Sequence, residues 1–160
     1  MTTATASAVT LSNLVSRHEV AERTTAFRFE KPSDWIFQAG QYLDLTLLDP
    51  SETDAEGNTR TFSIASGPHE DTLMVATRMR DTAFKRMLKT MPLGSAVKIE
   101  GPSGSLSLHN NVTRTAVLLA GGIGITPFPK HCFHCGDREA SSPNFPFLLE
   151  SPAGGRSVSR

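Results

Sequence analysis

Residues 60–66, Arg-Thr-Phe-Ser-Ile-Ala-Ser, place a cation, an aromatic ring and hydroxyl groups within one short segment. If the segment is a strand, its period of two puts Arg60 and Phe62 on one face and Thr61 and Ser63 on the other. A flavin nucleotide needs charge for its phosphates, a flat apolar surface for its ring and hydrogen-bonding groups near the ring heteroatoms. The segment therefore predicts a flavin-nucleotide site. The alternative is an exposed strand with an incidental arginine.

A second group of cations follows on the next predicted strand and helix. Arg78 and Arg80 share a strand face immediately before a helix that Asp81 or Thr82 can cap. Unpaired N–H groups at a helix N-terminus bind anions, and nearby arginines strengthen such a site. Charge on a short helix is often only a solvated face, but together with Arg60 these cations favour a diphosphate. We therefore expect FAD, with FMN as the alternative.

The elements that must position these residues are predicted to be short strands and one helix. Period-two alternation predicts strands, and the i, i+3, i+4, i+7 spacing of Phe84, Met87, Leu88 and Met91 predicts the helix. The acidic, turn-rich stretch 49–59 is predicted to be a loop. Regularly spaced short strands with one helix predict a small antiparallel barrel. The four clearest strands are Thr25–Glu30, Tyr42–Leu47, Leu73–Arg80 and Ala96–Glu100.

The pattern changes at Thr115. Residues 115–120 form a continuous apolar run, and they lead directly into the glycine-rich turn Gly-Gly-Ile-Gly-Ile-Thr-Pro at 121–127. A strand buried on both faces followed by such a turn is typical of the start of an α/β nucleotide-binding domain. No helix or second strand is predicted after Phe128, so we expect this domain to be incomplete in the chain.

Four motifs, in order, resemble the ferredoxin–NADP reductase superfamily and its FAD-binding domain. Residues 60–66 resemble the superfamily's Arg-x-Tyr/Phe-Ser/Thr-x-x-Ser signature. Residues 37–42 resemble its approach to the flavin strand, and residues 94–104 resemble its G-x-x-V-x-x-x-G-P-x-G turn. Residues 121–127 resemble the GGxGxTP entry to its nicotinamide domain. The similarity covers roughly residues 11–128.

This resemblance implies a role for each matching residue. It places Arg60 at the flavin phosphate, Phe62 against the isoalloxazine ring and Ser63, the candidate catalytic residue, near the redox-active nitrogen. The remaining candidates fall into four groups. Thr61 belongs to the flavin strand; Ala76, Thr77 and Arg78 would line the ring edge and ribityl chain; Ala83 and Phe84 would receive the pyrophosphate; Gly122, Gly124 and Thr126 would approach the nicotinamide nucleotide. Many members have a glycine and a serine where this chain has residues 81–84.

The implied activity is hydride transfer from NAD(P)H to FAD and onward passage of electrons to an acceptor protein or domain. The alternative is a non-catalytic flavin-binding module without NAD(P)H activity. We expect a flexible N-terminus at 1–8, the flavin-binding barrel at 9–111, the start of the nicotinamide domain at 112–128 and a disordered or aberrant tail at 129–160.

Composition excludes several other classes. Sixteen basic residues balance sixteen acidic ones, and aromatics make up 7%, which disfavours an oligonucleotide-binding barrel with a cationic groove and stacking rings. No apolar run approaches the ~20 residues of a membrane span, and no signal peptide is recognisable, so a cytoplasmic protein is expected. The Cys132–Cys135 pair with His131 and His134 has zinc-ligand types but no second pair at the usual spacing, so no metal is predicted.

Overall fold

The computed structural model describes residues 8–106 and 122–126 of the 160-residue chain. The predicted strand at 115–120, the tail from 129 onward and the possible zinc ligands at 131–135 lie outside the described residues. The described part contains six strands, one α-helix and one short 3₁₀ helix. These are β1 (Ala8–Ala21), β2 (Thr24–Glu30), β3 (Tyr42–Leu47), β4 (Thr59–Ser63), β5 (Thr72–Arg78), α1 (Ala83–Thr90), β6 (Ala96–Ser103) and η1 (Gly122–Ile125).

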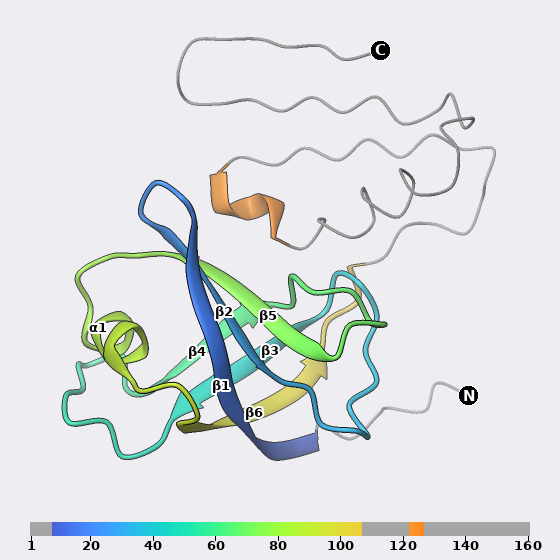
Figure 1. The fold of residues 1–160 in the computed structure, drawn as a ribbon, viewed down its shortest axis with the longest axis horizontal. Helices are drawn as coiled ribbons and strands as arrows, with labels where there is room; N and C mark the ends of the chain where they lie inside the picture. Colours follow the sequence, from blue (N-terminus) through green and yellow to red (C-terminus); the bar gives the residue numbers. More distant parts are fainter. Residues whose placement is uncertain (1–7, 107–121, 127–160) are drawn as a thin grey trace, which may run out of the picture.

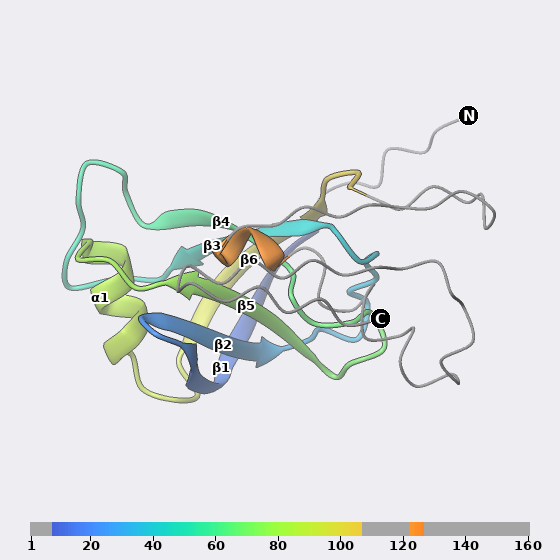
Figure 2. The ribbon, with the colours of Figure 1, turned by 90° about the horizontal axis from the view of Figure 1, so that it is seen from above.

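The six strands form one antiparallel sheet that curls into a barrel (Figures 1 and 2). Their order is β4-β3-β6-β1-β2-β5, so neighbours in space are often distant in sequence, as in a Greek key. The segment after β4 closes the barrel against β5. There the amide of Ala65 donates to the carbonyl of Met74 at 2.7 Å, and the Ser66 hydroxyl accepts from the Met74 amide at 3.0 Å. The predicted mainly-β barrel with one short helix is confirmed.

β1 is longer than the short strands that the sequence predicts. It spans 14 residues and serves both halves of the barrel, because residues 8–13 pair with β6 and residues 14–21 pair with β2. The β1–β2 pairing has a register shift between Leu14 and Ser16, close to the point where the partner of β1 changes from β6 to β2. Such irregularities bend a strand, which lets one strand turn the corner of a barrel.

The core contains the residues that the period-two patterns assign to one face of each strand. Leu43, Leu45 and Leu47 of β3 are buried, and so are Leu73 and Val75 of β5. The helix adds Phe84 and Leu88 to the same core, and Met87 of the helix and its C-cap residue Met91 pack partly against it. Thr82 is its N-cap, one of the two predicted candidates. At the other end, Arg17 of β1 donates to the carbonyl of Met91 at 2.6 Å, which fixes the helix C-terminus to the barrel.

Within residues 8–106 and 122–126, no helix has the length and apolar character needed to cross a membrane.

Candidate functional site

β4 and α1 bring the predicted flavin strand beside the predicted anion-binding helix. The guanidinium carbon of Arg60 lies 5.1 Å from the centre of the Phe84 ring, and the Phe62 and Phe84 ring centres are 6.0 Å apart. Arg60 and Phe62 are two residues apart on β4, so they share one face of the strand, and both side chains point toward the first turn of α1. Two segments separated by more than 20 residues in sequence therefore meet at one place.

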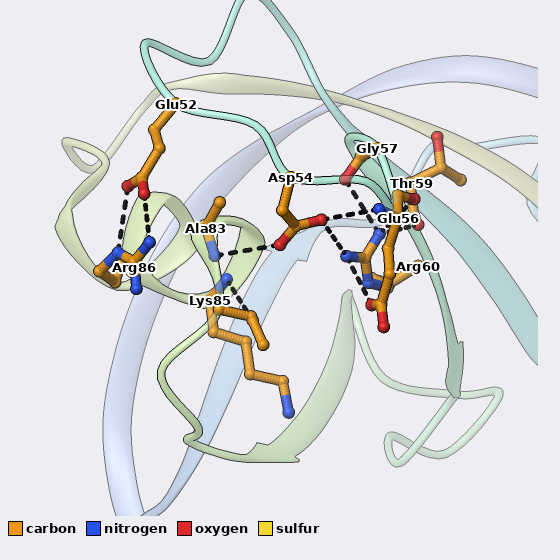
Figure 3. Close-up of polar contacts among 10 residues, drawn as sticks. Glu52, Asp54, Glu56, Gly57, Thr59, Arg60, Ala83, Lys85 and Arg86 are labelled. Carbon is orange, nitrogen blue, oxygen red and sulfur yellow. Dashed lines mark hydrogen bonds and ion pairs between the residues drawn. The ribbon is translucent and has the colours of Figure 1, made fainter.

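The first turn of α1 has two of its backbone N–H groups bound by side chains. The Thr82 hydroxyl accepts from the amide of Lys85 at 3.4 Å, as an N-cap residue does. The amide of Ala83 donates instead to Asp54 Oδ2 at 3.2 Å. The other oxygen of that carboxylate, Oδ1, lies 3.2 Å from Nη2 of Arg60 (Figure 3). Arg60 and the helix N-terminus thus converge on the same anionic group.

The surroundings of this first turn are electropositive. Arg78 and Arg80 are exposed where β5 leads into α1, and the ammonium group of Lys85 donates to the Arg78 carbonyl at 2.6 Å. Burial lowers the pKa of Lys85 below its ordinary value, and repulsion from Arg80 and Arg60 lowers it further. Cations that repel one another in this way are stabilised by an anion placed among them.

The remaining predicted residues of β4 have different surroundings. Phe62 is only 8% exposed and belongs to the hydrophobic core. Thr61 is exposed, and its hydroxyl donates to the carboxylate of Asp44 on β3. Ser63 is partly buried and lies opposite Tyr42 in the β3–β4 pairing. The Phe62 ring therefore presents little free surface beside which a flavin ring could lie in this conformation.

The predicted ring-edge residues of β5 divide between its two faces. Thr77 is 6% exposed and lies on the same face as the buried residues of the strand, whereas Ala76 and Arg78 lie on the other face. The glycine-rich turn approaches this strand as well, because η1, which includes Gly122 and Gly124, lies against β5 (orange in Figure 1). Thr126 ends the turn, with its hydroxyl donating to the Ile123 carbonyl at 2.9 Å.

Gln41 joins three of the four sequence motifs. Its backbone carbonyl accepts from the amide of Ile64 at 2.9 Å, and its side chain donates to the carbonyl of Gly104 at 3.2 Å. Gly104 has a φ of +96°, and a Cβ at this position would lie 2.8 Å from the ring of Tyr42. A glycine is therefore needed for the close approach that brings the motifs together.

A pocket of about 350 Å³ lies elsewhere, between the start of the β3–β4 loop and the C-terminal half of α1. Leu48, Pro50, Met87 and Met91 are among its lining residues, and none of the predicted site residues lines it. It is therefore separate from the candidate flavin site.

Sequence reasoning missed two residues of this site, Asp54 and Gln41. The signal for Asp54 was the run of carboxylates in the stretch 49–59, which is complementary in charge to the cations of residues 78–89. Local pattern alone does not show that these two stretches meet, since their contact depends on the path of the loop.

The barrel is similar to parts of known proteins. No family model matches the sequence. The reductase component 1 of terephthalate 1,2-dioxygenase from Comamonas sp is 34% identical over 93 residues, which cover 57% of this chain and 26% of that protein. The chain thus spans about a quarter of the length of this curated relative.

Solved structures share the fold over most of the chain. Phthalate dioxygenase reductase matches with a TM-score of 0.65 at 20% identity, over 82% of this chain and 40% of that one. A ferredoxin NADP⁺ reductase from Neisseria gonorrhoeae, with bound FAD and NADP, matches with a TM-score of 0.57 at 20% identity, over 76% of this chain and 49% of that one. The barrel is of the ferredoxin–NADP reductase type. The resemblance of the four motifs to that superfamily is thereby confirmed at the level of the fold.

Proposed function

We propose that this chain is the flavin-binding part of an NAD(P)H-dependent oxidoreductase and that its cofactor is FAD. One observation supports this most directly: Arg60 and the amide of Ala83 bind the two oxygens of a single carboxylate, each at 3.2 Å. A guanidinium and a helix N-terminus that already hold one anion form a suitable donor set for a phosphate. The nearby cations Arg78, Arg80 and Lys85 suit the two charges of a diphosphate.

The residues of the chain would bind and orient the cofactor. Arg60 and Ala83 would hold its pyrophosphate, Ser63 would lie near its ring, and Ala76 and Arg78 would border the ring edge and ribityl chain, whereas Phe62 would have to turn out of the core to lie against the ring. Thr61, Thr77 and Phe84 would support this arrangement from the strand and helix positions described above. When bound, FAD would supply the redox chemistry, accepting a hydride from NAD(P)H and passing electrons onward.

Two further features support a reductase role. The curated relative named above is the reductase component of a dioxygenase. One solved structure is described as transferring electrons from pyridine nucleotides to [2Fe-2S], and the other is a ferredoxin NADP⁺ reductase. Within this chain, η1, which contains Gly122 and Gly124, lies against β5, the strand proposed to border the flavin. We infer that this turn faces the nicotinamide nucleotide and that the electrons pass to a protein or domain acceptor.

Absorption spectroscopy tests the proposal. After incubation with FAD and removal of free ligand, the protein should retain the near-ultraviolet and blue absorption bands of a flavin, and dithionite should bleach them. FMN, which has one phosphate, should be retained more weakly. A protein that remains colourless after incubation with either flavin would contradict the proposal.

The alternative is a flavin-binding module that holds FAD without hydride transfer. Hydride transfer needs the nicotinamide held about 3–3.5 Å from the flavin in an aligned geometry. Anaerobic stopped-flow mixing with NADH and with NADPH separates the two candidates. Fast, saturable bleaching favours the reductase, and reduction no faster than that of free FAD favours the module.

A further inference from the structure

Asp54 occupies the place that the proposed function gives to a flavin phosphate. It lies in the loop of residues 48–58 between β3 and β4, and its two oxygens bind Arg60 Nη2 and the Ala83 amide (Figure 3). These are the two groups assigned above to the pyrophosphate. A carboxylate and a phosphate are both anions, so they cannot share these donors without strong repulsion.

The loop and the first residue of β4 also bind the other terminal nitrogen of Arg60. Its Nη1 donates to the carbonyls of Glu56 at 2.9 Å, Gly57 at 3.0 Å and Thr59 at 2.8 Å. Nη2 also lies 2.9 Å from Oε2 of Glu56. A guanidinium has five N–H donors, and these contacts engage both of its terminal nitrogens. In this conformation Arg60 is neutralised by two carboxylates of the loop.

The loop is fixed at its base and attached to α1 by polar contacts along its length. Leu47 and Asn58 bond to each other at the base, from the Leu47 amide to the Asn58 carbonyl at 2.9 Å and from Asn58 Nδ2 to the Leu47 carbonyl at 2.8 Å. Further along, Glu52 forms an ion pair with Arg86 of the helix. The side chains of Ser51, Glu52, Thr53 and Glu56 are exposed. The part beyond the base can therefore move without disrupting the β3–β4 pairing.

We propose that Asp54 is a built-in competitor for the flavin phosphate and that the 48–58 loop must leave the first turn of α1 before FAD binds. This inference rests on the proposed function. A ligand that binds only an open form has an apparent dissociation constant equal to the intrinsic value divided by the open fraction. With an open fraction of roughly 1–10%, within the usual range for minor conformers, the contact weakens apparent affinity about 10- to 100-fold.

The first test compares FAD affinity in the whole chain and two matched variants. Asp54→Asn keeps the shape of the side chain and removes its charge, whereas Asp34→Asn removes the same charge from an exposed position outside the loop. Fluorescence titration should give FAD binding at least about tenfold tighter for Asp54→Asn and unchanged for Asp34→Asn. Equal or weaker binding by Asp54→Asn would overturn the inference.

The proposed function and this inference fail in distinguishable ways. If neither the wild-type protein nor Asp54→Asn binds FAD, both are overturned. If the wild type binds FAD and Arg60→Ala weakens that binding while Asp54→Asn does not strengthen it, only the role of Asp54 is overturned.

A second test uses only the wild-type protein, so it does not depend on whether a variant folds. A protease that cleaves after glutamate can cut the loop after the exposed Glu52 and Glu56. Bound ligands usually protect a protein, but here saturating FAD should make cleavage of the loop faster by releasing it from α1. Inorganic pyrophosphate should have the same effect at higher concentration. Slower cleavage of the loop with FAD would overturn the inference.

Discussion

At the scale of single residues, the proposed site depends more on the chemical type of its side chains than on how deeply they are buried. Arg60 has a 19% exposed side chain that contacts two carboxylates, three carbonyls and an aromatic ring. Its planar guanidinium presents parallel N–H groups that match two oxygens of one group, a geometry that the ammonium of a lysine does not offer. The proposed role of Arg60 therefore requires this geometry as well as a positive charge.

Replacing Arg60 by Ala should weaken FAD binding about 10- to 100-fold, because a charge-assisted hydrogen bond contributes about 1.5–3 kcal/mol. Arg60→Lys should recover only part of the loss. Arg28→Ala is the matched control, since Arg28 is a strand arginine that pairs with Glu70 at 3.1 Å and has no contact with α1 among its described polar contacts. Fluorescence titration measures all three, and an unchanged dissociation constant for Arg60→Ala would remove Arg60 from the site.

At the scale of elements, an ion pair links α1 to the 48–58 loop. Arg86 on α1 pairs with Glu52 of the loop and with Asp81 just before the helix. The hydrogen bond to Arg86 holds the pKa of Glu52 below its ordinary value of 4.5, and the pKa of Arg86 is raised by the same contact. Because the pair is exposed, salt should weaken it, and its effect should be confined to this loop.

The ion pair predicts that one contact between the loop and α1 is present at neutral pH and is lost in acid. The folded-state pKa of Glu52 is depressed, so its contribution is complete above the ordinary carboxyl pKa and is lost as pH falls through the lower, folded value. Carboxyl-detected NMR titration should show the Glu52 pKa rising toward its ordinary value in Arg86→Ala. Lys89→Ala removes a nearby exposed helix cation as a control. An equal Glu52 pKa in wild type and Arg86→Ala would contradict this account.

At the scale of the whole molecule, the barrel is closed by a few contacts between its terminal strands. β4 and β5 are the two ends of the sheet, and Ser66 links the segment after β4 to Met74 of β5. Ser66 is 1% exposed, so no solvent replaces its hydroxyl if the contact is lost. The serine that ends the flavin-strand motif thus shapes the barrel.

Ser66→Ala should lower the free energy of unfolding by about 1–3 kcal/mol, because it leaves the Met74 amide without its side-chain acceptor. Since the contact closes the whole sheet, the loss should appear as a shift of a single urea transition with an unchanged slope. Ser33→Ala, at an exposed position, should leave the midpoint in place. A midpoint for Ser66→Ala equal to that of wild type would show that the barrel does not depend on this contact.

Much of the fold could be predicted from the sequence because its signals are local. The alternation in Tyr42–Leu47 and Leu73–Arg80 reflects the period of a strand with one buried face, and the spacing of Phe84 and Leu88 reflects the period of a helix. Arg60, Phe62 and the first turn of α1 were identified in the same way, from residue types at fixed intervals. Motif order then indicated the kind of barrel.

Only the tertiary structure decided which of these segments touch. The bend that lets β1 pair with both β6 and β2 depends on barrel closure, which no local period encodes. The sequence by itself predicted an acidic loop at 49–59, which the structure places at 48–58, and it determined that residues 78–89 are basic. The path of the chain decided that Asp54 reaches Ala83, 29 positions away, because contacts at such separation are set by strand register and loop direction.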